Sequence, residues 1–259
     1  MSLVKDIVVK PIKGDDARRF IRTHHYSGKT TANSQLHLGV FMGKRAVGCL
    51  QFGPSLDKTK LVGLVRDTPW YGFMELNRMA MINDTPRNSE SRAIAMSMRL
   101  IRQQYPQIQW IVSFADATQC GDGTIYRASG FILTGIKKNT QMIRFPDGRI
   151  VARKTLDNPN HVGSGGRFGS AIAREQGAVA LPGFQLRYVY FLDPTARARL
   201  TVPEIPFSRI AEVGASMYLG KPSRRSRLES ETPAAQAGHE GAAMRPTGST
   251  TDEPVWAVA

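Results

Sequence analysis

Apolar and polar residues alternate along the chain with two periods, and the changes between them predict an α/β fold. Continuous apolar runs and alternation with a period of two predict strands, whereas apolar spacings of three and four predict helices. The expected strands are 3–11, 36–41, 46–52, 74–81, 110–115, 131–136, 141–145 and 186–192, and the expected helices are 15–23, 89–105 and 124–129. This order predicts a mixed central sheet that is flanked by helices.

Two hairpins and one strand end are indicated most clearly. The polar residues 43–45 separate two apolar runs, and Asp147-Gly148 is a strong hairpin signal. The apolar run 110–115 has the length of a buried central strand and places Asp116 at its carboxyl end. Because open α/β sheets bind ligands at that edge, Asp116 is a candidate for orienting an amine. Capping of a turn explains the residue equally well.

Two imidazoles and a phenol, His24, His25 and Tyr26, follow the helix expected at 15–23. Adjacent side chains on a regular element face different ways, so we expect at most one of the histidines to join Asp116 in a site. A histidine on the surface or in the core is the simpler interpretation. The His-x-x-x-His spacing of a metal site does not occur in the sequence.

The composition changes after Gly220, where Ser, Pro, Ala, Gly and charged residues replace the apolar periodicity. We therefore expect one domain, 1–220, followed by a disordered tail, 221–259. No apolar run approaches the roughly 18 residues that span a bilayer, and the amino terminus lacks the pattern of a signal peptide. These observations predict a cytoplasmic protein that does not associate with membranes.

Formal net charge is +14 and the pI is about 10.2. The tail carries five basic and five acidic side chains, so the whole positive excess lies in residues 1–220. Such an excess favours a polyanionic partner, because neutralised phosphates release counterions. A solvated surface that is merely rich in Lys and Arg is the alternative. The basic residues expected near a nucleic-acid backbone are Lys137, Lys138, Arg144, Arg149, Arg153, Lys154 and Arg167.

The stretch 75–131 resembles the cofactor-binding half of an N-acetyltransferase-like domain. A strand, a polar turn, a long helix and a buried strand ending at Asp116 are followed by the pattern Tyr126-x-x-x-Gly130-Phe131. The resemblance implies a GNAT-like (N-acetyltransferase-like) α/β fold, with acetyl-CoA or a related acyl-CoA as cofactor. It also implies that Tyr126 lies near the thioester sulfur, where its hydroxyl returns a proton to the leaving thiolate.

The start of the helix 89–105 is an expected anion site, because the first backbone N–H groups of a helix have no partner within it. Arg87, Ser89 and Ser91 lie there and are candidate contacts of a CoA pyrophosphate. In acetyltransferase-like domains this segment carries glycine, which is absent here. A helix capped by Asn88 or Ser89 explains the same residues.

A narrower resemblance joins four motifs to the phage Mom family of DNA-modification proteins. The motifs are Glu75 to Ala80, Pro86 to Arg92, Ala115-Asp116-Ala117-Thr118-Gln119 and Gly123-Thr124-Ile125-Tyr126. The positions of this chain that match residues implicated in that family are His25, Tyr26, Arg78, Ser91, Asp116 and Tyr126. The resemblance therefore implies catalytic roles for Asp116, Tyr126, Tyr26 and His25 and a cofactor contact at Arg78.

The family resemblance also implies a reaction. The expected product is N6-carbamoylmethyladenine in DNA, which protects the DNA from host restriction enzymes. The expected partner is double-stranded DNA, from which the adenine is flipped, because N6 lies inside the stack. The resemblance further implies a bound iron, for which His25, Asp116 and Tyr126 are the candidate ligands.

Two other functions remain open on the sequence alone. A conventional acyl-CoA N-acetyltransferase would acetylate an amine of a protein or small molecule, although the missing glycine disfavours it. A non-enzymatic DNA-binding protein would shield restriction sites by occupancy. Such a binding protein would not require Arg78, Asp116 and Tyr126 to lie close together.

Overall fold

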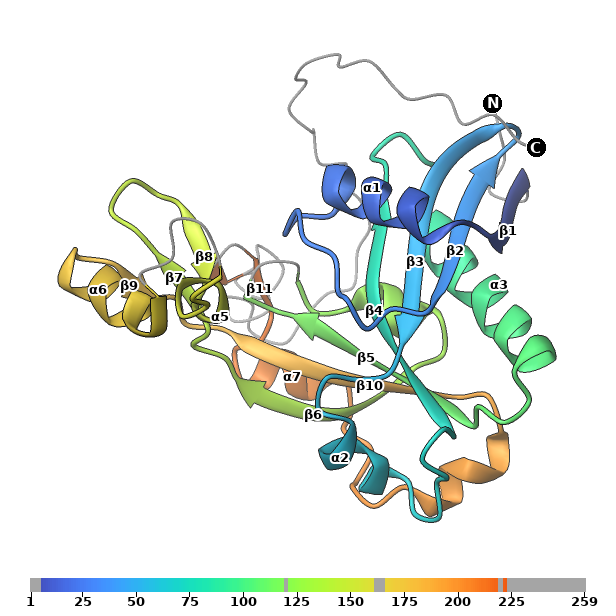
Figure 1. Cartoon of the computed structure of the whole chain (residues 1–259). Helices are drawn as coiled ribbons and strands as arrows, with labels where there is room; N and C mark the ends of the chain where they lie inside the picture. The colour runs from blue at the N-terminus through green and yellow to red at the C-terminus, as the bar shows by residue number, and fades with distance from the viewer. Residues whose placement is uncertain (1–5, 119–120, 161–165, 219–220, 223–259) are drawn as a thin grey trace, which may run out of the picture.

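The structure, a computed structural model, describes residues 6–118, 121–160, 166–218 and 221–222 (Figure 1). The strands are β1 (Ile7–Pro11), β2 (Leu36–Met42), β3 (Arg45–Gly53), β4 (Phe73–Met81), β5 (Trp110–Asp116), β6 (Ile132–Lys138), β7 (Met142–Arg144), β8 (Ile150–Ala152), β9 (Val179–Ala180), β10 (Phe184–Phe191), β11 (Met217–Tyr218) and β12 (Lys221–Pro222). The helices are α1 (Gly14–His24), α2 (Lys58–Leu61), α3 (Ser89–Gln104), α4 (Thr124–Ala128), α5 (Arg153–Leu156), α6 (Gly169–Glu175) and α7 (Ser208–Glu212), with 3₁₀ helices at Val62–Leu64, Gly166–Phe168 and Pro194–Arg199.

A seven-stranded sheet in the order β1-β2-β3-β4-β5-β10-β6 is the centre of the fold. Its neighbouring strands are antiparallel except for β4 and β5, which are parallel. The crossover between these two strands contains α3. This arrangement confirms the predicted mixed central sheet.

The parallel contact between β4 and β5 is short. It joins Phe73–Glu75 to Trp110–Val112, although both strands continue beyond these residues. On its other edge β4 carries a bulge: Gln51 pairs with Arg78 and Phe52 with Leu76, so Asn77 is the extra residue. A bulge bends and twists its strand. The carboxyl-terminal halves of β4 and β5 are therefore unpaired with each other.

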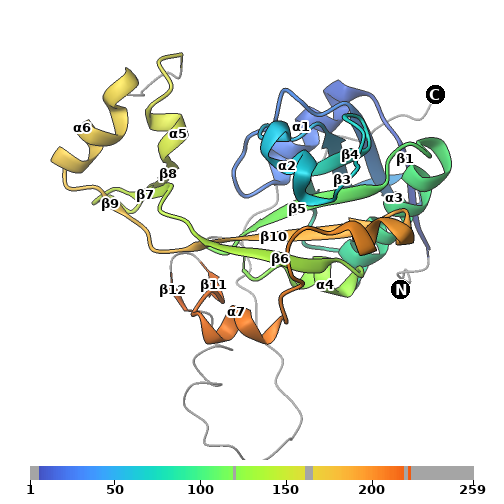
Figure 2. The same ribbon diagram turned by 90° about the horizontal axis from the view of Figure 1, so that it is seen from below.

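Helices cover the two faces of the sheet. Figure 2 shows α1 and α2 above it and α4 below it. On α3, Ile94, Met98 and Ile101 recur at helical spacing and are at most 1% exposed in the main core. On α1, Phe20 and Ile21 pack with Cys49 and Ala80 on the opposite face. The two helical layers therefore fix the positions of β4 and β5.

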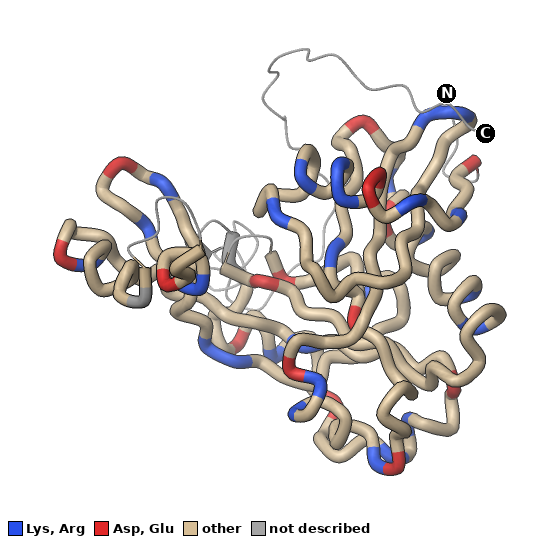
Figure 3. The backbone as a smooth tube through the Cα atoms, viewed as in Figure 1, with Lys and Arg blue, Asp and Glu red and all other residues tan. Residues whose placement is uncertain are grey.

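A small module, residues 139–183, interrupts the sheet between β6 and β10, and we call it the arm. It contains β7, β8 and β9 in a sheet of the order β8-β7-β9, together with α5 and α6. Ile143, Leu156, Ala173 and Ala178 form a separate small core. Figures 1 and 2 show the arm projecting from the seven-stranded sheet. Lysines and arginines occur both on the arm and on the rest of the described chain (Figure 3).

The long elements are confirmed within a few residues of the predicted bounds, and both hairpins are confirmed. The short helices α2, α5, α6 and α7 are not predicted by the pattern, because four to seven residues are too few to show a helical period. The strand expected at 186–192 is β10. Two further short strands, β11 and β12, which the sequence did not predict, come later in the chain. Apart from Lys221 and Pro222, the tail predicted to be disordered lies outside the described residues.

None of the described helices combines the length and the apolar composition required to cross a bilayer. The cytoplasmic location stays a prediction.

Candidate active site

A cavity of about 490 Å³ lies where β4 and β5 separate, and we call it the wedge cavity. His25 and Tyr26 reach it from the loop after α1, and Arg78 from β4. Asp116 reaches it from the end of β5 and Tyr126 from α4. Five candidate residues that were identified in separate segments of the sequence therefore line one cavity.

Arg78 fastens the loop after α1 to the bulge of β4. Its Nη1 donates to the carbonyl oxygen of Asn77 at 2.6 Å, and its Nε donates to the carbonyl oxygen of Lys29 at 3.2 Å. Lys29 in turn donates from Nζ to Oγ1 of Thr155 in the arm at 2.7 Å. The guanidinium thus has a positioning role in addition to the positive charge that it brings to the cavity.

His25 is held as a neutral side chain. Its Nδ1 accepts the backbone N–H of Ser27 at 3.2 Å and lies 2.8 Å from the Ser27 hydroxyl. Nδ1 therefore carries no proton, and the neutral ring has its proton on Nε2. Burial, assisted by the charge of Arg78, lowers the pKa of His25 from 6.5 to about 4. The ring of Tyr26, 57% exposed, lies 4.3 Å from the imidazole.

Asp116 both closes a turn and lines the cavity. Its Oδ1 accepts the backbone N–H of Thr118 at 3.0 Å, as the turn-capping interpretation predicts. Burial raises the pKa of the Asp116 carboxyl, while hydrogen bonds from Thr118 and Asn139 oppose that rise. The carboxylate is therefore half-buried and oriented, which suits it to accept an amine proton or an N–H hydrogen bond.

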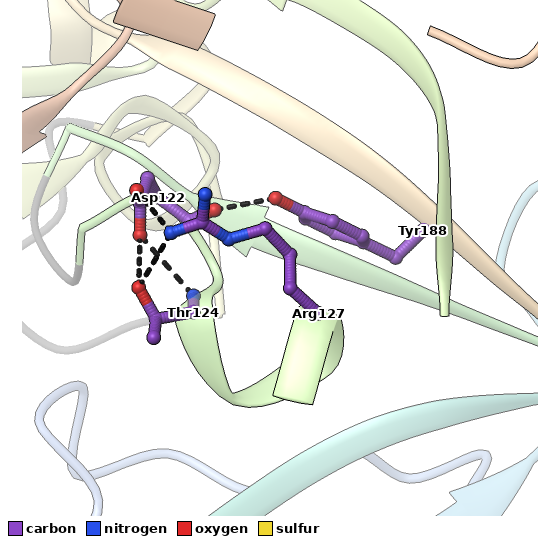
Figure 4. Close-up of polar contacts among 4 residues, drawn as sticks. All are labelled: Asp122, Thr124, Arg127 and Tyr188. Atoms are coloured by element: carbon purple, nitrogen blue, oxygen red, sulfur yellow. Dashed lines mark hydrogen bonds and ion pairs between the residues drawn. The ribbon is translucent and has the colours of Figure 1, made fainter. Parts of the chain in front are cut away.

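A polar network at the start of α4 positions Tyr126 (Figure 4). Asp122 Oδ1 accepts the backbone N–H of Thr124 at 3.2 Å and its hydroxyl at 2.6 Å. Arg127 donates to Oδ2 of Asp122 at 2.9 Å, and the hydroxyl of Tyr188 donates to the carbonyl oxygen of Asp122. Burial raises the pKa of Tyr188, so this hydroxyl remains a donor. Tyr126 itself is buried, with its ring centroid 5.2 Å from that of Tyr188.

A second cavity of about 470 Å³ lies at the amino terminus of α3 and is lined by Arg87, Asn88 and Ser91. Glu90, Thr124 and Ile125 line both this cavity and the wedge cavity, so the two adjoin. Ser89 is not among the lining residues: it is fully buried, and its hydroxyl donates to the carbonyl oxygen of Pro86 at 2.5 Å. The side chain of Ser89 therefore supports the turn and does not face a cofactor.

Asn88 gives the turn before α3 a left-handed backbone. Its φ of 70° lies in the left-handed region, for which glycine is the default and asparagine the usual substitute. Asn88 is the N-cap residue of α3, and its side chain makes no capping hydrogen bond. The turn before α3 therefore has a backbone conformation that glycine usually supplies, and the free backbone N–H groups at the start of α3, with Arg87 and Ser91, fit a CoA pyrophosphate. Glu90 places a carboxylate at the boundary with the wedge cavity, so the phosphates fit best on the Arg87 side.

The predicted iron site is not supported. Within the described part of the chain, no three His, Cys, Asp or Glu side chains form a group that holds a metal. Of the proposed ligands, His25 and Asp116 already use Nδ1 and Oδ1 for Ser27 and Thr118.

The residues that sequence reasoning missed are Glu75, Asn77 and Asp122. Glu75 and Asn77 are polar positions inside a predicted strand, a break in alternation that marks a bulge or a site. Asp122 precedes Gly123-Thr124, a combination typical of a capped turn. These signals identify special positions but not their partners.

Solved structures similar to this one include two N-acetyltransferases. The ribosomal-protein-S18-alanine N-acetyltransferase of Escherichia coli is 11% identical with a TM-score of 0.41, covering 72% of this chain and 94% of that enzyme. A spermidine/spermine N-acetyltransferase of Vibrio cholerae is 8% identical with a TM-score of 0.45, covering 75% and 98%. Both TM-scores lie below 0.5, so neither similarity carries information about the substrate. The mixed sheet with α3 between its two parallel strands agrees with the predicted N-acetyltransferase-like architecture.

Sequence comparison is more specific. A relative, the "Methylcarbamoylase mom" of Escherichia phage Mu, is 41% identical over 198 residues, which are 76% of this chain and 80% of the relative. This relative bears out the prediction of a transferase-like enzyme. The model of the Mom protein family matches residues 6–209. The chain belongs to the Mom protein family.

Proposed function

We propose that the chain is a DNA-modification enzyme that converts the N6 amino group of adenine to N6-carbamoylmethyl. One observation carries the proposal: His25, Tyr26, Arg78, Asp116 and Tyr126 come from four separate segments and line one cavity in a chain of the Mom family. Residues 1–220 are proposed as the catalytic domain, and the family match over 6–209 supports that boundary.

In such a reaction, different side chains of the wedge cavity have different roles. The carboxylate of Asp116 accepts an N–H of the adenine amine and holds its lone pair toward the wedge cavity. Neutral His25 presents Nε2–H to the same space, since its Nδ1 is an acceptor for Ser27. Tyr126 holds a proton at Oη that it returns to a departing group. Arg78 keeps the loop that carries His25 against β4.

An acyl-CoA would be held by the backbone at Asn88, the side chains of Arg87 and Ser91, and the adjoining wedge cavity. When bound, it supplies an activated two-carbon unit. Transfer of its carbonyl carbon to N6 would give an acetyl group, whereas a carbamoylmethyl group is attached through the neighbouring carbon and contains an amide nitrogen. The proposed reaction therefore needs a nitrogen donor, which displaces the CoA thiolate, and a two-electron oxidant, because bonding N6 to the methyl carbon replaces a C–H bond.

DNA is the proposed partner because residues 1–220 carry the whole positive charge excess of the chain. The N6 group of a paired adenine lies inside the duplex, so the base must leave the stack to reach side chains at the sheet edge. Phosphate contacts offset that cost. Because N6 forms part of the major-groove edge that proteins read, the modification would block restriction enzymes.

Expression of variants in cells tests the proposal, with nucleosides from the cellular DNA analysed by mass spectrometry. Asp116→Ala and Tyr126→Phe should each lower the modified deoxyadenosine by about 100-fold or more, as loss of an acid–base group does. Asp84→Ala is the control, because Asp84 is a 90% exposed carboxylate paired with Arg45. Full modification by either variant would remove that residue from the proposed mechanism.

The same experiment separates the other two functions. N6-acetyladenine, or acetylation of a different amine, would assign the chain as a conventional N-acetyltransferase, which the backbone of Asn88 also permits. Chemically normal DNA that remains tightly bound to the protein would assign a non-enzymatic shield.

A further inference from the structure

The three-stranded sheet of the arm is packed against helices on one face. Ile143 of β7 and Val151 of β8 are direct partners, and they pack with Leu156 of α5 and Ala173 of α6 in the small core. Because successive side chains of a strand point to opposite faces, the residues between these positions belong to the other face of the sheet. We call that other face the open face of the arm.

Arg144 lies at the centre of the open face. It is directly opposite Val179 of β9 on one side and Ile150 of β8 on the other. Directly opposite residues share a face, so an apolar side chain flanks the guanidinium on each side. Arg144 is exposed, and Val179 is 51% exposed. The open face therefore presents one cation between two apolar side chains.

The guanidinium of Arg144 is available to a ligand. It makes no hydrogen bond or ion pair with any other residue that the structure describes. Two other arginines of the arm differ in this respect, since Arg149 is paired with Asp147 at 2.6 Å and Arg153 with Asp157 at 3.3 Å. An arginine carries five N–H donors in a planar fork, and those of Arg144 are open to a partner with paired acceptors.

The charge of the arm fits a polyanion. Residues 139–183 contain six basic and three acidic side chains, and the exposed Lys137 and Lys138 directly precede them (Figure 3). Nucleic acid complements such a charge. The apolar neighbours of Arg144 further favour base edges over phosphates, because the methyl group of thymine accepts apolar contacts in the major groove.

The arm begins beside the wedge cavity. Asn139, its first residue, forms a hydrogen bond with the carboxylate of Asp116. Arg144 follows five residues later, and five residues of strand span about 17 Å at most. Duplex DNA rises about 3.4 Å per base pair, so this span corresponds to about five base pairs. A duplex whose adenine is at Asp116 therefore has its flanking base pairs within reach of the open face.

We propose that the open face of the arm lies in the major groove beside the target adenine, where Arg144 donates two hydrogen bonds to a guanine. The acceptors are O6 and N7 of that base, a pairing for which the guanidinium fork is suited. The groove admits a two-stranded ribbon such as β7 with β8, and N6 of adenine lies in the same groove. This inference rests on the proposed function and deepens it, because it assigns sequence recognition to a module outside the wedge cavity.

A phosphate contact is the alternative role for Arg144, and it is the role that the sequence alone predicted. Phosphate contacts carry no sequence information, whereas contacts to base edges do. Loss of a base contact therefore relaxes the sequence preference at one position. Loss of a phosphate contact lowers the affinity for all sequences equally.

Selection from a pool of duplexes tests the inference with the full chain. The pool has a central adenine and about six randomised base pairs on each side, and the bound DNA is sequenced after recovery at fixed salt. Wild-type protein should enrich a G·C pair about tenfold at a position within about five base pairs of the adenine, the order that one bidentate contact provides. Absence of G·C enrichment at every position would overturn the proposal.

Three substitutions assign the preference to Arg144. Arg144→Ala should reduce the enrichment to about twofold or less, and so should Arg144→Lys, which keeps the charge but lacks the fork. Arg174→Ala removes an exposed arginine of α6, a helix that packs on the opposite face, and should keep the full enrichment. Enrichment that persists in Arg144→Ala, with affinity lowered equally for all sequences, would assign Arg144 to a phosphate and contradict the proposal.

A change in the DNA tests the same contact even if Arg144→Ala does not fold. 7-Deazaguanine pairs normally with cytosine but lacks the N7 acceptor of the major groove. At the enriched position it should weaken binding of the wild-type protein by about threefold or more, the effect of one lost hydrogen bond. Unchanged affinity would reject the contact in the major groove.

The outcomes also separate this inference from the proposed function. Modified deoxyadenosine without G·C enrichment would refute only the role of Arg144. G·C enrichment without modified DNA would refute only the proposed reaction.

Discussion

Arg127 in α4 and Asp122, which lies just before this helix, form an ion pair of 2.9 Å on the two sides of Tyr126 in the sequence. Both side chains are 25% exposed, and Thr124 and Tyr188 complete the hydrogen bonding around Asp122 (Figure 4). The network holds residues 122–124 against α4 and β10. It therefore sets the position of Tyr126 relative to Asp116.

Asp122→Ala should destabilise the protein by about 1–3 kcal/mol, because it leaves a half-buried guanidinium and the amide of Thr124 without their acceptor. Modification should fall further than stability alone explains, since Tyr126 loses its support. Urea unfolding and nucleoside analysis measure the two effects. Glu212→Ala is the control: it breaks a pair of equal length with Arg209 that is about half exposed, and should leave the urea unfolding midpoint nearly unchanged.

Gly123→Ala should be among the most damaging single-methyl additions. Its φ of 72° is strained for alanine, and the added Cβ would lie 2.6 Å from the Tyr188 ring. We expect a loss of about 2–4 kcal/mol, combining backbone strain with overpacking. Gly148→Ala separates the two terms, because Gly148 has a φ of 88° but open space around it, and should cost about 1–2 kcal/mol. Equal losses in the two variants would show that contact with Tyr188 is unimportant.

His25 should make stability depend on acid pH. Its pKa falls from 6.5 to about 4 on folding, so the unfolded chain takes up the proton first as pH decreases. The free energy of unfolding is therefore not reduced by His25 above about pH 6.5, and it decreases progressively as the pH falls toward 4. His25→Gln should flatten the wild-type decline across this interval in urea unfolding. The exposed His24→Gln should leave it unchanged, and an unaltered decline in His25→Gln would assign the dependence elsewhere.

Asn88 should be replaceable by glycine but not by alanine. Asn88→Gly preserves access to a φ of 70°, so affinity for CoA by calorimetry should stay within about twofold of wild type. Asn88→Ala should lose about 1–2 kcal/mol of stability and weaken CoA binding. Asp67→Ala introduces comparable strain at a φ of 55° away from the cavities and should not affect CoA. Undiminished CoA binding by Asn88→Ala would reject the anion site at α3.

The local pattern of apolar and polar residues was sufficient to predict the long helices and strands and to identify Asp116 as a candidate site residue. The apolar run before Asp116 has the length typical of a buried strand, and the period of Ile94, Met98 and Ile101 is typical of a helix. The family resemblance distinguished His25 from His24 and added Arg78, whose segment carries no chemical signature of its own.

Tertiary relationships account for what the sequence did not predict. Tyr188 and Asp122 are 66 positions apart, and no local signal pairs them. The bulge at Asn77 depends on the register between β3 and β4, which a one-strand pattern does not specify. The left-handed backbone of Asn88 could not be distinguished from an ordinary N-cap without the structure. In the arm, β7 and its hairpin with β8 were predicted, whereas α5, α6 and β9 are too short to show a period.

Mass spectrometry of nucleosides tests the central claim most directly. DNA from cells that express the full chain should contain a deoxyadenosine in which a carbamoylmethyl group replaces one N6 hydrogen, and DNA from cells with the empty vector should not. Parallel gels must show folded wild-type protein in the expressing cells. Only unmodified deoxyadenosine in the presence of that protein would contradict the account.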